Sequence, residues 1–281
     1  MQPIRGSVRY LLAGTFHSLA YVAWGDHAAD VVLCVHGLTR NGRDFDPLAE
    51  ALADRFHVIC PDLPGRGASD WLPDPVLYQP ASYVAALSHL LAAIGRPVAW
   101  VGTSLGGICG MLVAAAAGQP ITRMVLNDIG PFIPAASLRR IRDYLPGPEP
   151  SSFADLAAIE QYLRRVHAPF GPLSDAQWGF LARISARAVP QEGLTLHYDP
   201  RIAEPMRAAE PEDIDLWQVW ERIRVPVLVV RGAESDLLLP ETLARMAQSG
   251  AETFVVPATG HAPALMEPGQ VAAIRGFLEA A

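Results

Sequence analysis

The sequence predicts an α/β fold in which helices cover both faces of a parallel sheet and a helical segment is inserted into the chain. Short hydrophobic runs rich in β-branched residues alternate with helix-like segments in residues 1–131 and again in residues 225–281. Strands buried on both faces give such continuous apolar runs, so the alternation is typical of a parallel sheet. Residues 132–224 contain no strong strand signal. We therefore predict a core formed by residues 1–131 and 225–281 and an all-helical cap formed by residues 132–224.

The first part of the core is predicted to begin with two strands joined by a glycine-containing turn, after which strands and helices alternate. The helix over Tyr83–Ile94 shows apolar residues at three- and four-residue spacing, and each strand is a short apolar run. The predicted strands are Val8–Leu12, Leu19–Trp24, Val31–Val35, His57–Cys60, Pro97–Val101 and Met124–Leu126, and the predicted helices are Asp46–Leu52, Tyr83–Ile94 and Leu105–Ala117.

Two pairs of polar residues in the cap indicate where helices begin. Ser152 with Asp155, and Ser174 with Gln177, have the spacing of a capping box, and each pair precedes an amphipathic run. A third helix is predicted to start at Pro211. The core then resumes with strands Val227–Val230 and Thr253–Val256 and helices Pro240–Gln248 and Gly269–Ala280.

Charge and composition exclude several classes of function. The chain of 281 residues has a net charge of −7, which argues against a nucleic-acid-binding surface. All 22 basic residues are arginine, so mechanisms that need a lysine, such as a Schiff base or a P-loop, are excluded. The longest uncharged apolar run, Leu105–Gly118, is too short to span a membrane, and we find no signal-peptide pattern. We expect a cytoplasmic protein whose three cysteines are reduced core thiols.

The most specific motif is Gly102-Thr-Ser-Leu-Gly106, which lies between a predicted strand and a predicted helix. This is the setting of a G-x-S-x-G nucleophile, in which a strained turn exposes the serine and the flanking glycines avoid a steric clash. The N-terminus of the following helix also favours negative charge that develops nearby. The motif therefore predicts Ser104 as a nucleophile.

A nucleophilic serine needs a base, and the base needs an orienting carboxylate. His261 follows the last predicted strand, where a loop can bring it to Ser104, and we predict it as the base. Asp236 follows the preceding strand, in the chain order serine, aspartate, histidine that is typical of hydrolases, and we predict it as the acid. Asp128, which also follows a strand, and Glu234 remain open as alternatives.

The remaining site residues are predicted from their place in the chain. The backbone amides of Leu38 and Leu105 are the expected oxyanion hole, because one amide follows the nucleophile and the other follows an early strand. Arg139, Arg142 or Arg164 would hold an acidic group of a substrate, and no spacing indicates a metal site. The candidate substrate-binding residues are Phe132, Ile133, Tyr162, Trp178, His197 and Leu237.

With these motifs the chain resembles the α/β-hydrolase superfamily over essentially its whole length. The resemblance implies an eight-stranded, mostly parallel sheet, a helical cap inserted after the sixth strand, a serine hydrolase of the esterase or meta-cleavage-hydrolase type, and no cofactor. The matching segments are His36–Leu38, Asp62–Ser69, Gly102–Gly107, Arg231–Asp236 and Gly260–Pro263.

The expected function is hydrolysis of a small carboxylic ester, thioester or lactone through an acyl-enzyme. The expected partner is the small-molecule substrate, with no nucleic acid or membrane, and the oligomeric state stays open. C–C bond hydrolases of the meta-cleavage type are the alternative. These usually have asparagine and methionine around the serine and tryptophan after the histidine, whereas this chain has Thr103, Leu105 and Ala262. A ligand receptor and a cofactor-free oxygenase on the same fold are alternatives of a different class.

Overall fold

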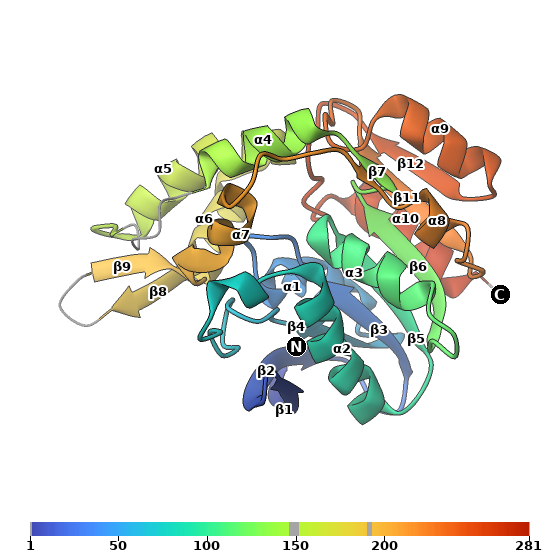
Figure 1. The fold of residues 1–281 in the computed structure, drawn as a ribbon, viewed down its shortest axis with the longest axis horizontal. Helices are drawn as coiled ribbons and strands as arrows, with labels where there is room; N and C mark the ends of the chain where they lie inside the picture. The colour runs from blue at the N-terminus through green and yellow to red at the C-terminus, as the bar shows by residue number, and fades with distance from the viewer. Residues whose placement is uncertain (1, 146–151, 190–192, 281) are drawn as a thin grey trace.

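The computed structural model describes residues 2–145, 152–189 and 193–280, and eight of its strands form one sheet (Figure 1). These strands are β1 (Ile4–Leu12), β2 (Thr15–Trp24), β3 (Asp30–Val35), β4 (Phe56–Pro61), β5 (Val98–Thr103), β6 (Ile121–Asn127), β11 (Val227–Gly232) and β12 (Glu252–Val256). Their order is β1-β2-β4-β3-β5-β6-β11-β12, with antiparallel pairing only at β1–β2 and β2–β4. The expected eight-stranded, mostly parallel sheet is thereby confirmed.

Helices cover both faces of this sheet, as a parallel sheet requires. They are α1 (Asp46–Leu52), α2 (Pro80–Ile94), α3 (Leu105–Ala114), α9 (Pro240–Gln248) and α10 (Pro268–Glu279), with short 3-10 helices at Gly42–Phe45 and Pro75–Leu77. Apolar residues of α1 and α10 belong to one buried cluster, and those of α2 and α3 belong to the cluster on the opposite face. No helix in the described ranges is long and apolar enough to cross a membrane.

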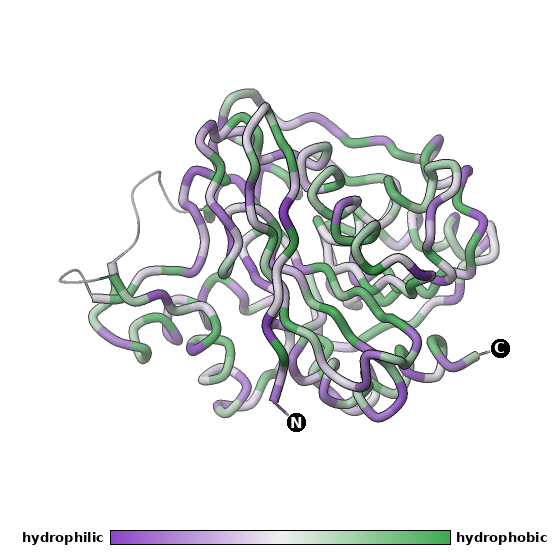
Figure 2. Tube along the Cα trace, turned by 90° about the horizontal axis from the view of Figure 1, so that it is seen from below, coloured by the Kyte–Doolittle hydropathy of each residue, from purple (hydrophilic) through white to green (hydrophobic). Residues whose placement is uncertain are grey.

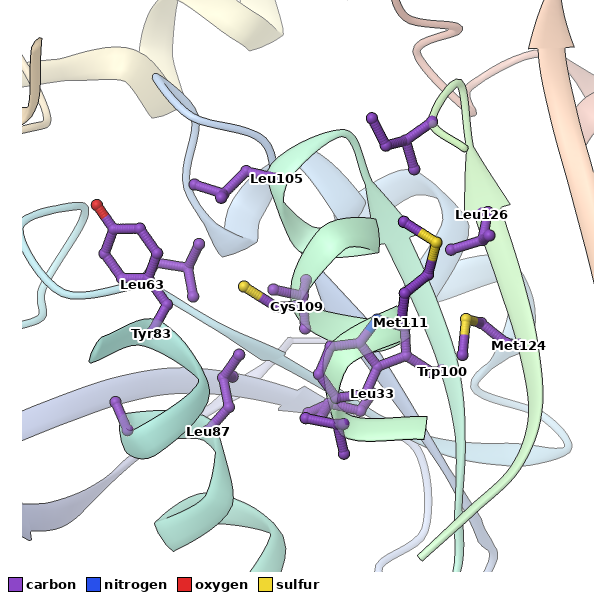
Figure 3. Close-up of a cluster of buried hydrophobic side chains, with 14 of the residues drawn as sticks. Leu33, Leu63, Tyr83, Leu87, Trp100, Leu105, Cys109, Met111, Met124 and Leu126 are labelled. Atoms are coloured by element: carbon purple, nitrogen blue, oxygen red, sulfur yellow. The ribbon is translucent and has the colours of Figure 1, made fainter. Parts of the chain in front are cut away.

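The core around α3 is packed closely enough to fix the turn that precedes this helix. Figure 3 shows Trp100 of β5 and Met111 of α3 in one cluster with Leu87 of α2 and Leu33 of β3. The indole Nε1–H of Trp100 donates to the carbonyl of Gly106 at 3.1 Å. The three cysteines are free and buried, as expected. Figure 2 shows short hydrophobic stretches that alternate with polar ones along the trace.

The residues between β6 and β11, which we call the insertion, contain both helices and short strands. Figure 1 shows α4, α5, α6 and the β8–β9 pair together at one side of the molecule, away from β1 and β2. The helices are α4 (Ala135–Tyr144), α5 (Leu156–Val166), α6 (Asp175–Ser185), α7 (Glu204–Arg207) and α8 (Trp217–Trp220), with 3-10 helices at Ala168–Phe170 and Pro200–Ala203. The strands are β7 (Phe132–Ile133), β8 (Ala186–Val189), β9 (Gly193–Leu196) and β10 (Ile214–Asp215).

The expectation of an all-helical segment was therefore wrong in this detail. β8 pairs with β9 and β7 pairs with β10, each pair antiparallel. Strands of two to four residues are too short to show a period of two in the sequence. Ser174 forms the predicted capping box with Gln177, whereas α5 is capped by Asp155 rather than by Ser152.

Among the contacts that attach the insertion to the sheet and its loops, two lie at separated places. Near one end, the backbone amide of Asp199 donates to the carbonyl of Gly65 at 2.8 Å, and the hydroxyl of Tyr78 donates to the Asp199 carboxylate at 2.6 Å. Near the other end, Arg140 of α4 donates two hydrogen bonds to the carboxylate of Asp236, which follows β11. These contacts position the insertion over the side chains that follow the parallel strands.

Candidate active site

Ser104 sits in a strained turn between β5 and α3. Its φ and ψ are 50° and −114°, a backbone conformation that is rare for residues other than glycine. A Cβ atom at Gly102 would lie 2.5 Å from the carbonyl oxygen of Gly106, and one at Gly106 would overlap the carbonyl of Val35. Both glycines of the motif are thus required by close backbone packing, as the sequence pattern predicted.

His261 lies beside Ser104. Its ring Nε2 is 3.0 Å from the Ser104 hydroxyl oxygen, and its side chain is 10% exposed. The residue follows β12, at the same edge of the sheet where β5 ends, so the two side chains meet although 157 residues separate them. The predicted juxtaposition of serine and histidine is present in the structure.

Asp128, and not Asp236, lies against the other nitrogen of His261. The Nδ1 atom of His261 is 2.8 Å from Oδ2 of Asp128, whose side chain is fully buried. The expectation that Asp236 orients the histidine is therefore wrong, and the alternative, Asp128, has the right geometry. Asp236 is half exposed and forms an ion pair with Arg140, while Glu234 is exposed.

The position of Asp128 explains why the chain order serine, aspartate, histidine did not identify the right aspartate. Asp128 and Asp236 both lie between Ser104 and His261 in the sequence, so either satisfies the chain order, and both follow strands, β6 and β11, that are neighbours in the sheet. Asp128 directly follows β6 with φ of 54°, and its backbone amide donates to Val230 at 2.7 Å. The loop after β11 instead supports this carboxylate, because Ser235 and the amide of Gly232 both donate to it, at 2.5 and 2.8 Å. Sequence reasoning missed Ser235, which carries no motif signal of its own.

The two amides predicted as an oxyanion hole belong to Leu105, directly after the serine in the chain, and to Leu38, and both residues line the same cavity as Ser104. Leu105 is the first residue of α3, where an amide has no acceptor within the helix. Leu38 follows Gly37, at which a Cβ atom would lie 3.7 Å from Cβ of Ser104. The turn is held by His36, whose Nδ1–H donates to the carbonyl of Gly37 at 2.7 Å and whose Nε2 accepts from the amide of Leu63 at 2.9 Å. Burial lowers the pKa of His36 to about 3, so the ring is neutral at physiological pH.

Ser104 and His261 line a cavity of about 720 Å³ between the sheet edge and the insertion. Ile133 and Leu237 line it as predicted, whereas Phe132, Tyr162, Trp178 and His197 do not. The apolar and aromatic residues of the wall that the sequence did not single out include Tyr78, Ile108, Ile129, Leu138, Ile141, Val166, Phe170 and Met206.

The four misplaced residues have other surroundings. Tyr162 and His197 line a separate, much smaller hollow, and Phe132 pairs with Asp215 in the β7–β10 ladder. Trp178 is buried under the guanidinium of Arg164. An amphipathic pattern shows which face of a helix is buried but not whether it faces a cavity or packed side chains.

The arginines expected to hold an acidic group are paired with acidic residues. Arg139 and Arg142 both bind Glu210, and Arg164 binds Glu160 and Asp175. None of these three arginines lines the cavity. Within the described residues, no group of three or more His, Cys, Asp or Glu side chains is arranged to hold a metal ion.

Comparison with known proteins gives the family. The sequence pattern described as "Alpha/beta hydrolase family" matches residues 32–274. The chain belongs to this family. The 3-hydroxybutyrate-oligomer hydrolase of Cupriavidus necator is 41% identical, with 99% of each chain covered. The pimeloyl-[acyl-carrier protein] methyl ester esterase of Stenotrophomonas maltophilia is 30% identical over 87% of this chain and 90% of its own.

A solved structure agrees with this assignment. The crystal structure of an α/β hydrolase from Novosphingobium aromaticivorans is 37% identical, covers 98% of both chains and has a TM-score of 0.87. Together, the family pattern and these relatives support a hydrolase.

Proposed function

We propose that this α/β hydrolase is a serine esterase with Ser104 as nucleophile, His261 as base and Asp128 as the orienting acid. The observation that carries the proposal is one continuous chain of hydrogen bonds, 2.8 Å from Asp128 to His261 and 3.0 Å from His261 to Ser104. This chain joins a buried carboxylate to a strained serine that lines a large cavity, which is the arrangement of a nucleophilic triad. Two relatives that are named for ester or oligomer hydrolysis support the same reaction class.

In the proposed mechanism, Nε2 of His261 takes the hydroxyl proton of Ser104 as its oxygen attacks the ester carbonyl. The amides of Leu38 and Leu105 stabilise the negative charge on the carbonyl oxygen. His261 then donates the proton to the leaving alcohol, and a water molecule activated by the same ring cleaves the acyl-enzyme. Asp128 holds the proton on Nδ1 and stabilises the imidazolium that forms in each step.

The cavity supports a substrate that is small, mainly apolar and longer than a single acyl group. Its volume of about 720 Å³ is within the range of about 300–1,000 Å³ that is usual for small-molecule sites. We infer that residues 132–224 act as a cap, because Ile133, Leu138, Ile141 and Val166 of the insertion provide apolar walls. A short oligoester of a hydroxy acid, the class named for the relative from Cupriavidus necator, satisfies these conditions.

The decisive experiment replaces the nucleophile. Ser104→Ala is expected to lower kcat for p-nitrophenyl butyrate by at least about 10³-fold, because the acyl-enzyme cannot form. The melting temperature should stay within a few degrees, since alanine removes one hydroxyl group and leaves the backbone turn unchanged. Turnover that persists in this variant would contradict the proposal, and oxygen consumption that persists would favour a cofactor-free oxygenase.

A further inference from the structure

Most polar side chains in the inner wall of the cavity already have partners. The hydroxyl of Tyr78 donates to Asp199 at 2.6 Å and accepts from the amide of Leu72 at 2.8 Å, and the guanidinium of Arg40 donates to Asp44 and to Ser185. These groups are fixed by the protein and have little capacity left for a ligand. A side chain that recognises a polar group of a substrate is therefore to be sought among the few that remain without such bonds.

His167 is one of these side chains without a hydrogen-bond partner in the protein. It follows α5, lines the cavity together with Ser104, and is 7% exposed. No described residue forms a hydrogen bond with either of its ring nitrogens, and neither nitrogen is among the fully buried polar atoms that lack a partner in the described residues, so neither is sealed from solvent. Its imidazole stacks on the ring of Phe170, with 4.5 Å between the centroids and an interplanar angle of 18°. Stacking covers a face of the imidazole and leaves the edge that carries the nitrogens uncovered by Phe170.

The backbone holds this ring in place. The amide of His167 donates to the carbonyl of Leu163 at 2.7 Å, and its carbonyl accepts from the amide of Phe170 at 2.9 Å. The side chain is thus presented from a fixed turn and not from a loose loop, which is the condition for a selective hydrogen bond.

The charge state of His167 indicates what it can bind. Burial, followed by electrostatic interaction with Arg40 and His261, lowers its pKa well below the ordinary value. Arg40 itself is held by two hydrogen bonds to Asp44, each 2.7 Å long. A neutral imidazole offers one N–H donor and one nitrogen acceptor, which is the complement of an alcohol group.

We propose that His167 determines specificity by forming a hydrogen bond with an oxygen on the acyl chain of the substrate, so that the enzyme prefers hydroxyacyl esters to unsubstituted esters. Val166 and Phe170, which also line this wall, are apolar, and the guanidinium of Arg40 nearby is held by Asp44 and Ser185. In a wall that is mainly apolar, a hydrogen bond to one of these nitrogens favours an ester whose acyl chain carries an oxygen over an ester that lacks it. This inference rests on the proposed ester hydrolysis at Ser104.

The test compares two esters that differ by one hydroxyl group, methyl butyrate and methyl 3-hydroxybutyrate, with hydrolysis followed by titration of the released acid. In His167→Phe, which keeps a ring on Phe170 but has no nitrogen, kcat/KM for the hydroxy ester should fall about 3- to 10-fold. The value for methyl butyrate should change less than about twofold, and His167→Gln should recover part of the preference, because its amide can form the same hydrogen bond.

Val166→Ala is the matched control, because it alters the same wall without a polar group and should shift both esters together. An equal fall for both esters in His167→Phe, or a wild-type enzyme without preference, would overturn the proposal. If neither ester is cleaved, the proposed function fails instead, and calorimetric binding of both esters to Ser104→Ala then decides the role of His167. If Ser104→Ala and the double variant Ser104→Ala, His167→Phe bind methyl 3-hydroxybutyrate equally tightly, the proposed role of His167 is also overturned.

Discussion

Asp128 is held in one orientation by the groups around its carboxylate. Oδ1 accepts from the amide of Gly232, while Oδ2 accepts from the hydroxyl of Ser235 and faces Nδ1 of His261. Two donors that belong to the protein keep the buried carboxylate from rotating away from the ring, so Ser235 is a positioning residue in this arrangement. The adjacent Asp236 points away and contributes to the attachment of α4.

The first prediction separates the two aspartates. Asp128→Asn should lower kcat for p-nitrophenyl butyrate by about 10⁴-fold, because an amide in that place favours the wrong tautomer of the histidine. Asp236→Asn is the control and should change kcat less than about threefold, since its carboxylate contacts Arg140 and not His261. Steady-state kinetics of both purified variants measures this, and a larger loss in Asp236→Asn would contradict the assignment of Asp128.

The second prediction concerns His36 and pH. Its pKa is about 3 in the folded protein and about 6.5 in the unfolded chain, so the unfolded chain binds the additional proton between these values. Stability that depends on neutral His36 is therefore present above pH 6.5 and is lost as pH falls, by about 2 kcal/mol between pH 7 and pH 5.

Asp62 opposes this trend, because burial raises the pKa of its carboxyl group to about 6 and the folded protein then binds more protons between pH 6 and pH 4. The comparison of wild type with His36→Gln isolates the histidine, since Asp62 is present in both. Urea unfolding at pH 7 and pH 5 should show a smaller loss of stability on acidification in the variant. The same loss in both proteins would show that His36 does not contribute.

At the scale of the element, the turn from β5 to α3 depends on backbone atoms that lie closer than a side chain permits. The third prediction is that Gly102→Ala destabilises the protein by about 2–4 kcal/mol. It should also reduce esterase activity, because the added Cβ would displace α3 and with it Ser104. Gly276→Ala in α10 is the matched control, since a Cβ atom meets nothing within 4 Å there. It should raise stability by about 0.5–1 kcal/mol, and thermal unfolding of the two variants tests the contrast.

The elements that could be predicted from sequence are those with a long or continuous apolar pattern. Helices α1 and α9 were predicted with their observed bounds, because each lies between clear polar or proline boundaries. The short strands of the insertion were missed, because two to four residues carry no measurable period. Ser104 and His261 follow from motifs at strand ends, whereas the choice between Asp128 and Asp236 depends on side-chain directions that no spacing encodes.

At the scale of the molecule, two of the contacts that attach the insertion differ in strength. The contact at Asp199 is buried: its carboxylate accepts from Tyr78 and forms an ion pair with Arg201. The contact at Arg140 and Asp236 is 38% and 49% exposed. A buried hydrogen bond to a charged group contributes more than an exposed ion pair, so the Asp199 side should hold the insertion more firmly.

The last prediction compares these two attachments. Tyr78→Phe removes the donor to Asp199 and also the acceptor for the amide of Leu72, so it should destabilise the protein by about 1–3 kcal/mol. Asp236→Asn should cost less than about 1 kcal/mol, because water and salt screen an exposed pair. Hydrogen–deuterium exchange should rise in β9 and the residues up to Asp199 for Tyr78→Phe alone. The opposite result would be a rise around α4 in Asp236→Asn without a rise in β9 in Tyr78→Phe. It would mean that the exposed ion pair contributes more than the buried contact to holding the insertion.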